Sequence, residues 1–341
     1  MKQLVKLATS LLALVSSMSI IADDYTKGTL EVIKERGYLK CGVSTGMSGF
    51  AYLNKDGVWE GFDVSFCRAT AAAIFNDPSK VEFTPTTSKN RWSVLQSKEV
   101  DLLYRSSTWT LTRDSSLGLS FSVVNYYDGQ GFLVKKDLGV NSARELDGAT
   151  ICVAMGTTTE LNLARYFKDN NMNYSPIYVE TFQQAISAFR AGRCDIYTTD
   201  ASALAVAKST FDNPEEYVVL PEIISKEPLG PVVRADEPKF GKLVQWVFYA
   251  TVQAEEFGLT QANIDDMKNT TSSIEKFLGV EDNTAPDIGL SKDFAYRVIK
   301  HVGNYGELFE KYLGVNTKIG LQRGLNDLYT RGGLHYSPPF K

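Results

Sequence analysis

The chain has 341 residues, of which 43% are hydrophobic and 22% are charged, a composition typical of soluble globular proteins. Its length corresponds to about two domains. The net charge of −4, the pI of about 5.5 and the absence of a stripe of lysine and arginine argue against a nucleic-acid partner.

Residues 1–22 have the pattern of a secretory signal peptide. Lys2 and Lys6 form a positive head, an apolar stretch spans 7–21, and Ala22 is a small residue before two acids. The stretch is too short and too polar for a membrane span, and the remaining alternative is a buried N-terminal helix. We expect cleavage near Ala22, with the exact bond left open, and export to the periplasm.

Helical and extended patterns alternate after this leader. Gly61 breaks the chain, and apolar or small residues then recur at helical spacing. The expected elements, in order, are a short helix after Gly28, a strand at about 38–43, a helix at 62–75, a strand at 81–87, a helix at 91–99 and a buried strand at 100–104. This order is typical of a mainly parallel sheet covered by helices.

The same alternation restarts at about residue 145. Residues 145–167 predict a strand, a glycine-containing turn and a helix, and 176–200 predict strand, helix and strand. The segments 121–134 and 224–234 are extended, carry Gly and Pro, and are interpreted as crossovers between two lobes. The first lobe would then be formed by 23–125 and 230–341, the latter with a helical C-terminal extension, and the second lobe by 126–229.

The four cysteines are informative if the chain is exported. None has metal-like spacing, and an even number in an oxidising compartment indicates two disulfides. Three pairings are possible, with four free thiols as the alternative. We favour Cys41–Cys67 and Cys152–Cys194, because each pair then lies within one half of the chain.

A potential carboxylate receptor follows the expected strand at 100–104. The guanidinium of Arg113 matches a carboxylate bidentately, and Thr108 and Ser106 offer a hydroxyl and a backbone group beside it. Thr110, three residues earlier, is suited to cap a helix there. The alternative is a surface arginine that pairs with Asp114.

The second α/β unit offers complementary groups. Thr157 and Glu160 have the spacing of a capping box, and a helix N-terminus attracts anions, although most capping boxes only start helices. Asp200 ends the strand CDIYTTD, where it can receive an ammonium group or cap the next helix. Because ligands bind at the carboxyl ends of parallel strands, this set with Arg113 suits a zwitterion.

The sequence contains no pattern that indicates catalysis. Its two histidines, His301 and His335, lie far along the chain from these strand ends, and no nucleophile–base pair is visible. Dinucleotide and phosphate-loop motifs are absent. No catalytic residue, metal or cofactor is therefore expected.

The chain resembles the periplasmic solute-binding proteins of polar amino acid ABC importers, and most closely the general L-amino acid-binding subgroup. The resemblance runs from about Gly28 to Lys341. It rests on the motifs EGFDV, LQSKEVDLL, STWTLTRD, FSVVNYYDGQGFLV, GTTTELN, AGRCDIYTTD, ISKEPLGPVVR, GNYGE and RGLNDLY…GGLHYSPPF. It implies the two-lobed type II periplasmic-binding-protein fold, with the ligand between the lobes.

The resemblance also implies roles for individual residues. Arg113 would clamp the α-carboxylate, Thr108 and Ser106 would bind the carboxylate and the α-amino group, Thr158 in the GTTTELN motif beside Thr157 would donate to the carboxylate, and Asp200 would receive the α-amino group.

Three further positions follow from looser matches. The segment TSKNR is similar to one in acidic amino-acid binders, so Ser88 and Arg91 are candidates for the pocket; the alternative for Arg91 is a surface helix cap. Many family members have a stacking aromatic residue after the first strand, where this chain has STGMSGF. Met47 would take that place, and its adaptable side chain suits a permissive pocket.

The implied function is an extracytoplasmic receptor that binds L-amino acids with broad specificity and delivers them to membrane-embedded ABC permease subunits. We expect a monomer that binds no nucleic acid. The alternative is a periplasmic enzyme on the same fold, such as a cyclohexadienyl dehydratase, which needs a general acid in the cleft. A sensor ectodomain and an interaction protein without a ligand fit the sequence less well.

Overall fold

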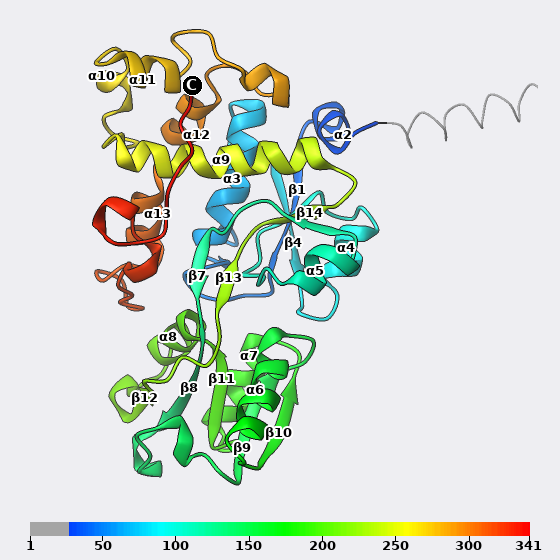
Figure 1. Ribbon diagram of the computed structural model, residues 1–341, viewed down its shortest axis with the longest axis vertical. Coiled ribbons are helices and arrows are strands. Elements are labelled where there is room, and N and C mark those ends of the chain that lie inside the picture. Colours follow the sequence, from blue (N-terminus) through cyan, green and yellow to red (C-terminus); the bar gives the residue numbers. More distant parts are fainter. Residues whose placement is uncertain (1–26) are drawn as a thin grey trace, which may run out of the picture.

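The computed structural model of the protein describes residues 27–341, and the signal peptide expected at 1–22 lies outside the described residues. Figure 1 shows two bodies, one above the other, joined by a pair of strands. Each body is built on a five-stranded sheet. We call them the first lobe and the second lobe, in the order in which the chain enters them.

The first lobe contains the sheet β4-β1-β5-β14-β6. Four strands run in one direction and β14, which arrives after the second lobe, runs against its neighbours. The strands are β1 (Leu39–Ser44), β4 (Val81–Thr86), β5 (Leu102–Leu103), β6 (Leu119–Phe121) and β14 (Val232–Arg234). The expected strand at 100–104 is therefore shorter than predicted.

Helices cover this sheet and extend beyond it at the C-terminal end (Figure 1). They are α2 (Thr29–Arg36), α3 (Phe62–Phe75), α4 (Arg91–Gln96), α5 (Leu111–Ser116), α9 (Pro238–Glu256), α10 (Ile264–Met267), α11 (Ser272–Phe277), α12 (Phe294–Val302) and α13 (Tyr305–Tyr312). Central α3 is buried on nearly all sides, because its alanines and Phe62 and Phe66 face both the sheet and the other helices. Burying each phenylalanine contributes about 2 kcal/mol.

The second lobe contains the sheet β10-β9-β11-β8-β12, in which β8 alone runs against the other four strands. Its strands are β8 (Gln130–Lys135), β9 (Ala149–Ala154), β10 (Tyr174–Val179), β11 (Ile196–Asp200) and β12 (Tyr217–Val219), and its α-helices are α6 (Thr158–Asp169), α7 (Phe182–Arg190) and α8 (Ala201–Ser209). Short 3-10 helices complete the two lobes: η1 (Lys136–Leu138), η2 (Ala143–Glu145), η3 (Pro214–Glu216), η4 (Ala285–Ile288), η5 (Gly324–Asn326) and η6 (Tyr329–Arg331).

Two crossover strands join the lobes. They are β7 (Tyr126–Asp128) and β13 (Glu227–Leu229), which lie within the two segments predicted to be crossovers. They pair antiparallel, with Glu227 opposite Asp128, a pairing that the sequence did not predict. The residue boundaries expected between the lobes, at 125/126 and 229/230, stay a prediction.

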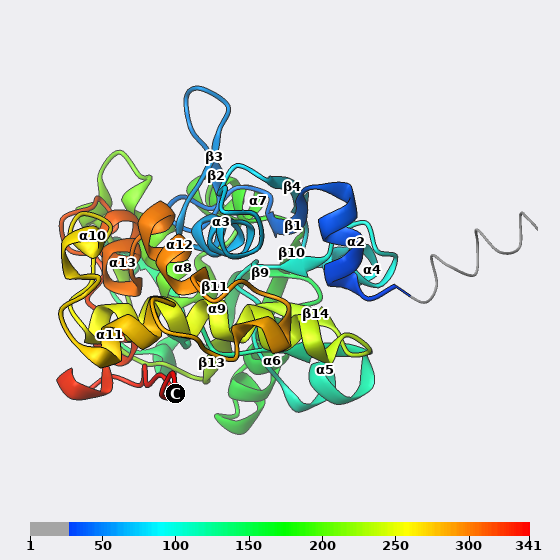
Figure 2. The same cartoon turned by 90° about the horizontal axis from the view of Figure 1, so that it is seen from above.

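A hairpin projects from the first lobe between β1 and α3, where no element was expected from the sequence. It consists of β2 (Tyr52–Leu53) and β3 (Trp59–Glu60), and Figure 2 shows it standing clear of the body. Its tip exposes apolar side chains, since Leu53 is 54% and Val58 45% accessible.

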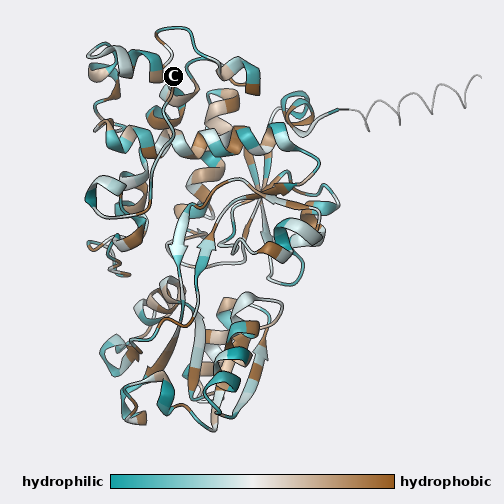
Figure 3. Cartoon of the chain, viewed as in Figure 1, coloured by the Kyte–Doolittle hydropathy of each residue, from teal (hydrophilic) through white to brown (hydrophobic). Residues whose placement is uncertain are grey.

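The interior of each lobe is apolar. Figure 3 shows hydrophobic residues on strands of both sheets and alternating with hydrophilic residues along the helices, and the buried residues of both lobes are mostly hydrophobic. No helix within residues 27–341 is long and apolar enough to cross a membrane.

The favoured disulfide pairing is confirmed. Cys41–Cys67 joins β1 to α3, and Cys152–Cys194 joins β9 to the segment before β11. The pairs are separated by 26 and 42 residues, so each restricts a long loop of the unfolded chain. A loop-entropy argument gives each bridge about 4 kcal/mol of stabilisation.

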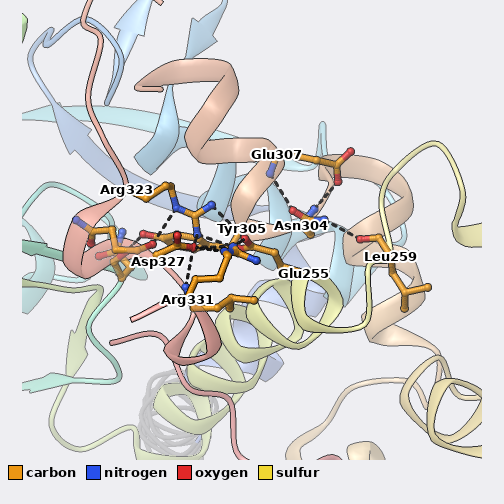
Figure 4. A network of polar contacts seen from close by, with 11 residues as sticks. Glu255, Leu259, Asn304, Tyr305, Glu307, Arg323, Asp327 and Arg331 are labelled. Carbon is orange, nitrogen blue, oxygen red and sulfur yellow. Dashed lines mark hydrogen bonds and ion pairs between the residues drawn. The ribbon is translucent and has the colours of Figure 1, made fainter. Parts of the chain in front are cut away.

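An ion-pair network attaches the C-terminal segment to the first lobe (Figure 4). Arg323 donates to both carboxylate oxygens of Glu255 on α9 at 3.1 Å, and Arg331 pairs with Glu255 and Asp327. Nearby, Asn326 bonds both backbone groups of Tyr127 on β7, at 2.6 and 2.9 Å. The C-terminal segment therefore braces one of the two crossover strands.

His335 makes the attachment of this segment sensitive to acid. It is 2% exposed, packs on Tyr305 at 4.2 Å between ring centroids, and its Nε2 has no hydrogen-bond partner. Burial, reinforced by the charge of Arg323, lowers the pKa of His335 from 6.5 to about 3. Below pH 6.5 His335 therefore binds a proton in the unfolded chain but not in the folded chain. The free energy of unfolding decreases as pH falls toward 3.

The expected result is that His335→Phe reduces the acid sensitivity of the protein. Between pH 7 and 4.5, the free energy of unfolding should fall by about 3 kcal/mol less than in the unsubstituted protein. Urea unfolding at the two pH values measures this difference. His301→Gln is the matched control, because His301 is the other histidine and lies at the surface beside Asn76. Equal acid losses in His335→Phe and the unsubstituted protein would contradict the assignment.

Candidate functional site

A polar cleft between the lobes contains the whole predicted ligand set. The first lobe contributes Met47, Ser88, Arg91, Ser106, Thr108 and Arg113 to its lining, and the second lobe contributes Thr157, Thr158 and Asp200. Loops after β1, β4 and β5 face the start of α6 and the end of β11. The carboxyl ends of parallel strands from two sheets thus meet at one place, although ligand contacts by these residues stay a prediction.

Three arginines meet in this cleft. Arg91 begins α4 and is 2% exposed, Arg113 lies in α5 and is 8% exposed, and Arg105 follows β5. Among the described residues, none of the three forms an ion pair with a carboxylate. A buried cation without a counter-ion is costly, so Arg91 and Arg113, with the half-buried Arg105 beside them, indicate a place for an anion.

Hydrogen bonds hold two of the guanidinium groups in place. Arg113 donates from Nη1 to the carbonyl oxygen of Thr108 at 2.8 Å, and Arg105 donates from Nη2 to Oγ of Ser88 at 2.9 Å. The Nε of Arg91 is buried without a partner, and this guanidinium lies over the ring of Trp92 at 4.3 Å. Arg91 is therefore a core-facing residue, and its interpretation as a surface helix cap is wrong.

Electrostatics in the cleft favour a bound anion. Burial lowers the pKa of Arg91, and the charges of Arg105 and Arg113 lower it further. Burial and Arg113 likewise lower the pKa of Arg105 to about 10. A carboxylate between these groups would reverse both effects, because an opposite charge nearby favours the ionised form.

The alternative interpretation of Arg113 also fails. Thr110 caps α5 as predicted, since its hydroxyl accepts from the Arg113 N–H at 3.2 Å. Asp114 instead accepts from the backbone N–H of Phe121 at 3.1 Å. The Arg113 side chain turns inward from the first turn of the helix.

The hydroxyls expected to reach the ligand are bonded to Glu227. Thr108 Oγ1 donates to its Oε2 at 2.5 Å, and Thr158 Oγ1 donates to the same atom at 2.8 Å. A hydroxyl has one proton to donate and two lone pairs. In this arrangement Thr108 and Thr158 therefore present hydrogen-bond acceptors, rather than donors, to the cleft.

Ser106 occupies a strained position beside them. Its φ of 45° lies in the left-handed region, which costs a non-glycine residue about 1 to 2 kcal/mol. Its hydroxyl donates to Oδ2 of Asp63 at 2.9 Å. Burial raises the pKa of Asp63 to about 6, against the opposing effect of the bonds from Ser106 and Asn125. Strain of this kind gathers at functional sites.

Thr157 serves mainly to start α6. Its hydroxyl accepts from the Glu160 N–H at 3.2 Å and contacts the Ala154 carbonyl at 2.6 Å. Glu160 reaches back to the N–H of Gly156 at 2.9 Å, one residue earlier than a capping box requires. The first turn of α6 still directs backbone N–H groups toward the cleft, as any helix N-terminus does.

Asp200 does not cap the next helix. It occupies the N-cap position of α8, yet its side chain makes no capping hydrogen bond. Burial first, then the charges of Asp128 and Glu227, raise its pKa well above the usual value, while Arg113 and Arg91 oppose the rise. A cationic group placed in the cleft would stabilise the ionised carboxylate.

Apolar side chains form another part of the lining. Met47, in the loop after β1, is 7% exposed and bridges to Ala51. Phe182 of α7 also lines the cleft, from the second lobe. An aromatic side chain, which many family members place after the first strand, therefore lines the cleft from the second lobe in this protein.

Within residues 27–341 no group of three or more His, Cys, Asp or Glu is placed to hold a metal ion.

Several cleft or hinge residues were missed from the sequence, among them Arg105, Phe182 and Glu227. Arg105 was visible as an arginine directly after a buried strand, the same signal that singled out its neighbours. Phe182 begins a helix at a strand end and could have been found in the same way. Glu227 had no such signal, because it lies in a Lys-Glu-Pro sequence typical of an exposed loop.

Comparisons with known proteins agree with this architecture. The profile of the bacterial extracellular solute-binding proteins, family 3, matches residues 39–262. The general L-amino acid-binding periplasmic protein AapJ of Rhizobium johnstonii is 52% identical over 316 residues, covering 92% of this chain and 93% of its own length. The glutamate/glutamine/aspartate/asparagine-binding protein BztA of Rhodobacter capsulatus is 52% identical over 329 residues, covering 96% and 97%.

A solved structure shares the fold over its whole length. It is an ABC transporter periplasmic binding protein from Brucella ovis with glutathione bound, 49% identical, with a TM-score of 0.90. The match covers 92% of this chain and all 100% of the other. The two-lobed type II fold class expected from the sequence is confirmed.

Proposed function

This chain belongs to the bacterial extracellular solute-binding proteins, family 3, and we propose that it binds L-amino acids between its lobes and delivers them to an ABC permease in the membrane. The carrying observation is that two buried arginines, Arg91 and Arg113, and the half-buried Arg105 form no ion pair and face a carboxylate that makes no helix cap. This charge pattern complements the carboxylate and ammonium groups of an amino acid. The relatives AapJ and BztA, both named for amino acid binding, support the same class of ligand.

The proposed division of labour follows from the contacts. Arg113 binds the α-carboxylate together with backbone N–H groups at the start of α6. Asp200 and the oxygen lone pairs of Thr108 receive the α-ammonium group. Closure of the lobes removes water from these pairs and strengthens them.

We place the protein in the periplasm, where its periplasmic relatives act, as a receptor rather than an enzyme. A thermal-shift scan of the ligand-stripped mature chain tests this proposal. The panel contains the common L-amino acids, glutathione and prephenate. Stabilisation by several unlike amino acids supports a general receptor. A response to prephenate alone would instead favour the dehydratase alternative.

Arg91 and Arg105 exceed what one α-carboxylate requires. They would suit a second carboxylate on the ligand side chain, as in glutamate or aspartate. Glutathione, bound by the Brucella ovis protein, also carries two carboxylates, so it is a second candidate ligand of the same cleft.

Arg91→Leu is expected to weaken glutamate binding at least tenfold more than glutamine binding, because only glutamate loses a charged partner. The ligand-free variant should be at least as stable as the parent protein, since a buried unpaired cation is removed. Calorimetric titration and thermal unfolding measure the two effects.

The matched control is Arg234→Leu. Arg234 is also buried, but it donates to the carbonyls of Leu95 and Val100 and to Thr29. Its loss should destabilise the fold and leave the glutamate-to-glutamine ratio unchanged. An unchanged ratio in Arg91→Leu would remove Arg91 from the binding site.

A further inference from the structure

We propose that Glu227 is a positioning residue that holds the lobes together around the ligand by accepting hydrogen bonds from the first lobe and from α6 of the second. This inference rests on the proposed function, because it concerns closure of the same cleft. It assigns a role to a residue whose sequence context suggested none.

The position of Glu227 in the chain makes it suited to this role. It begins β13, one of the two crossover strands, and pairs with Asp128 on β7. It is 1% exposed, although it lies in a Lys-Glu-Pro sequence. A buried carboxylate at a hinge is unfavourable unless it is well hydrogen-bonded, so its contacts explain its presence.

Four donors surround this carboxylate. Oε2 accepts from Thr108 at 2.5 Å and from Thr158 at 2.8 Å, and Oε1 accepts from Asn162 Nδ2 at 2.7 Å and Ser225 Oγ at 2.6 Å. Hydrogen bonds to an ionised acceptor are about twice as strong as neutral ones. One side chain thus collects donors from both lobes and from its own crossover segment.

The two sides of this arrangement differ in how firmly they are attached to the hinge. Thr108 forms a backbone bridge with Leu229, and the Trp109 N–H donates to the Pro228 carbonyl at 2.8 Å, so the first-lobe side is fixed to β13. Thr158 and Asn162 lie on α6 and have no such connection to β13 in the described hydrogen bonds. Separation of the lobes would therefore break the contacts of Glu227 with α6.

The same contacts set the polarity of the site. By accepting both hydroxyl protons, Glu227 leaves the lone pairs of Thr108 and Thr158 facing the cleft, 3.3 Å apart. The cleft then discriminates between the two ends of a zwitterion: guanidinium groups for the carboxylate, hydroxyl oxygens for the ammonium. Glu227 acts through these residues and does not itself line the cleft.

The test compares Glu227→Gln with Glu222→Gln. Glu222 lies shortly before the crossover segment and accepts from Ser142 Oγ at 2.5 Å and from the Ala143 N–H at 3.0 Å, but both partners are in the second lobe. Glu227→Gln is expected to raise the dissociation rate of L-glutamine at least tenfold and to change the association rate less than threefold. Stopped-flow fluorescence measures both rates, and Glu222→Gln should match the parent protein.

Asn162→Ala provides a second variant that keeps the hinge intact. Asn162 is half-buried and contacts Glu227 only from the α6 side, so this change should fold and should raise the dissociation rate by a smaller factor. Small-angle scattering should show that the glutamine-saturated Glu227→Gln protein has a larger radius of gyration than Glu222→Gln. A dissociation rate equal to that of Glu222→Gln, or equal loss in both rate constants, would overturn the proposal.

Failure of the proposed function has a different signature. If the parent protein binds no amino acid in the thermal-shift panel, the receptor assignment fails. Scattering from the ligand-free variants still decides the role of Glu227 in that case: a larger radius for Glu227→Gln than for Glu222→Gln supports it, and equal radii overturn it.

Discussion

Arg113→Ala is expected to weaken the binding of every amino acid ligand about 10³-fold, because truncating one partner of a buried charge pair costs about 4 kcal/mol. The α-carboxylate is common to all amino acids, so the loss should not depend on the ligand side chain. Calorimetric titration with glutamine, glutamate and leucine measures it. The fold should persist, since the side chain makes one structural hydrogen bond, to the carbonyl of Thr108.

Arg165→Ala is the matched control for this change. Arg165 is an exposed arginine on α6, and its loss should leave affinity and stability unaltered. Circular dichroism and thermal unfolding check that Arg113→Ala is folded. Two results would defeat the assignment of Arg113: affinity that is retained, or a variant that does not fold.

Asp200→Asn is expected to weaken glutamine binding about 100-fold at pH 7.5 and to flatten its dependence on pH. The first effect is the loss of the charged partner of the α-ammonium group, about 3 kcal/mol. The second follows from the raised pKa of Asp200, which burial and the charges of Asp128 and Glu227 produce. In the ligand-free cleft the carboxyl group binds a proton more readily than an exposed aspartate does.

The affinity for an amino acid should decrease at low pH. An ammonium ligand needs the ionised carboxylate, so affinity should fall as pH decreases through the pKa of ligand-free Asp200, by up to tenfold per unit. Glutamine is the ligand of choice, because its side chain does not titrate. Titrations from pH 5 to 8 measure the slope. Some slope should remain in Asp200→Asn, since the buried Asp63 and Asp128 each have a pKa raised to about 6.

Stability provides an independent check on Asp200. A carboxyl group whose pKa is raised on folding contributes stability at low pH that is lost as pH rises through its folded-state pKa. The ligand-free Asp200→Asn protein should therefore melt at a higher temperature than the parent protein at neutral pH. Asp169→Asn, at the exposed end of α6, is the control. An Asp200→Asn variant with the parent's affinity and pH slope would refute the ammonium role.

These predictions describe a site whose ligand-free state is electrostatically unfavourable. Arg91, Arg105 and Arg113 repel one another, and Asp200 lies among other carboxylates. In the proposed function a zwitterion would balance both the excess positive and the excess negative charge, which would tie ligand binding to closure of the cleft. Glu227 adds contacts that exist when α6 is close to the hinge, so closure is favoured by the protein as well as by the ligand.

Local patterns in the sequence determined much of this protein. Helical spacing over 62–75 placed α3, and the restart of strand–helix alternation near 145 placed the second sheet. The location of one cysteine pair in each half of the chain favoured the disulfide pairing that the structure has, out of three possible ones. Polar residues at strand ends grouped Arg113, Thr108 and Asp200 as candidates, because strand ends gather at one edge of a parallel sheet whatever the details of packing. Their individual roles were implied by the resemblance to the solute-binding proteins and stay predictions.

Tertiary structure alone decided which polar groups are already partnered. The hydroxyls of Thr108 and Thr158 looked free to reach a ligand, yet both are held by Glu227, which lies 119 and 69 residues away in the chain. Asp200 stood at a helix start like an ordinary cap, and for Arg91 both a place in the pocket and a surface helix cap were open. Whether a side chain caps a helix, is buried or is paired depends on neighbours that are distant in the sequence. Hydrogen bonds between lobes produce no periodic pattern in the sequence from which they could be predicted.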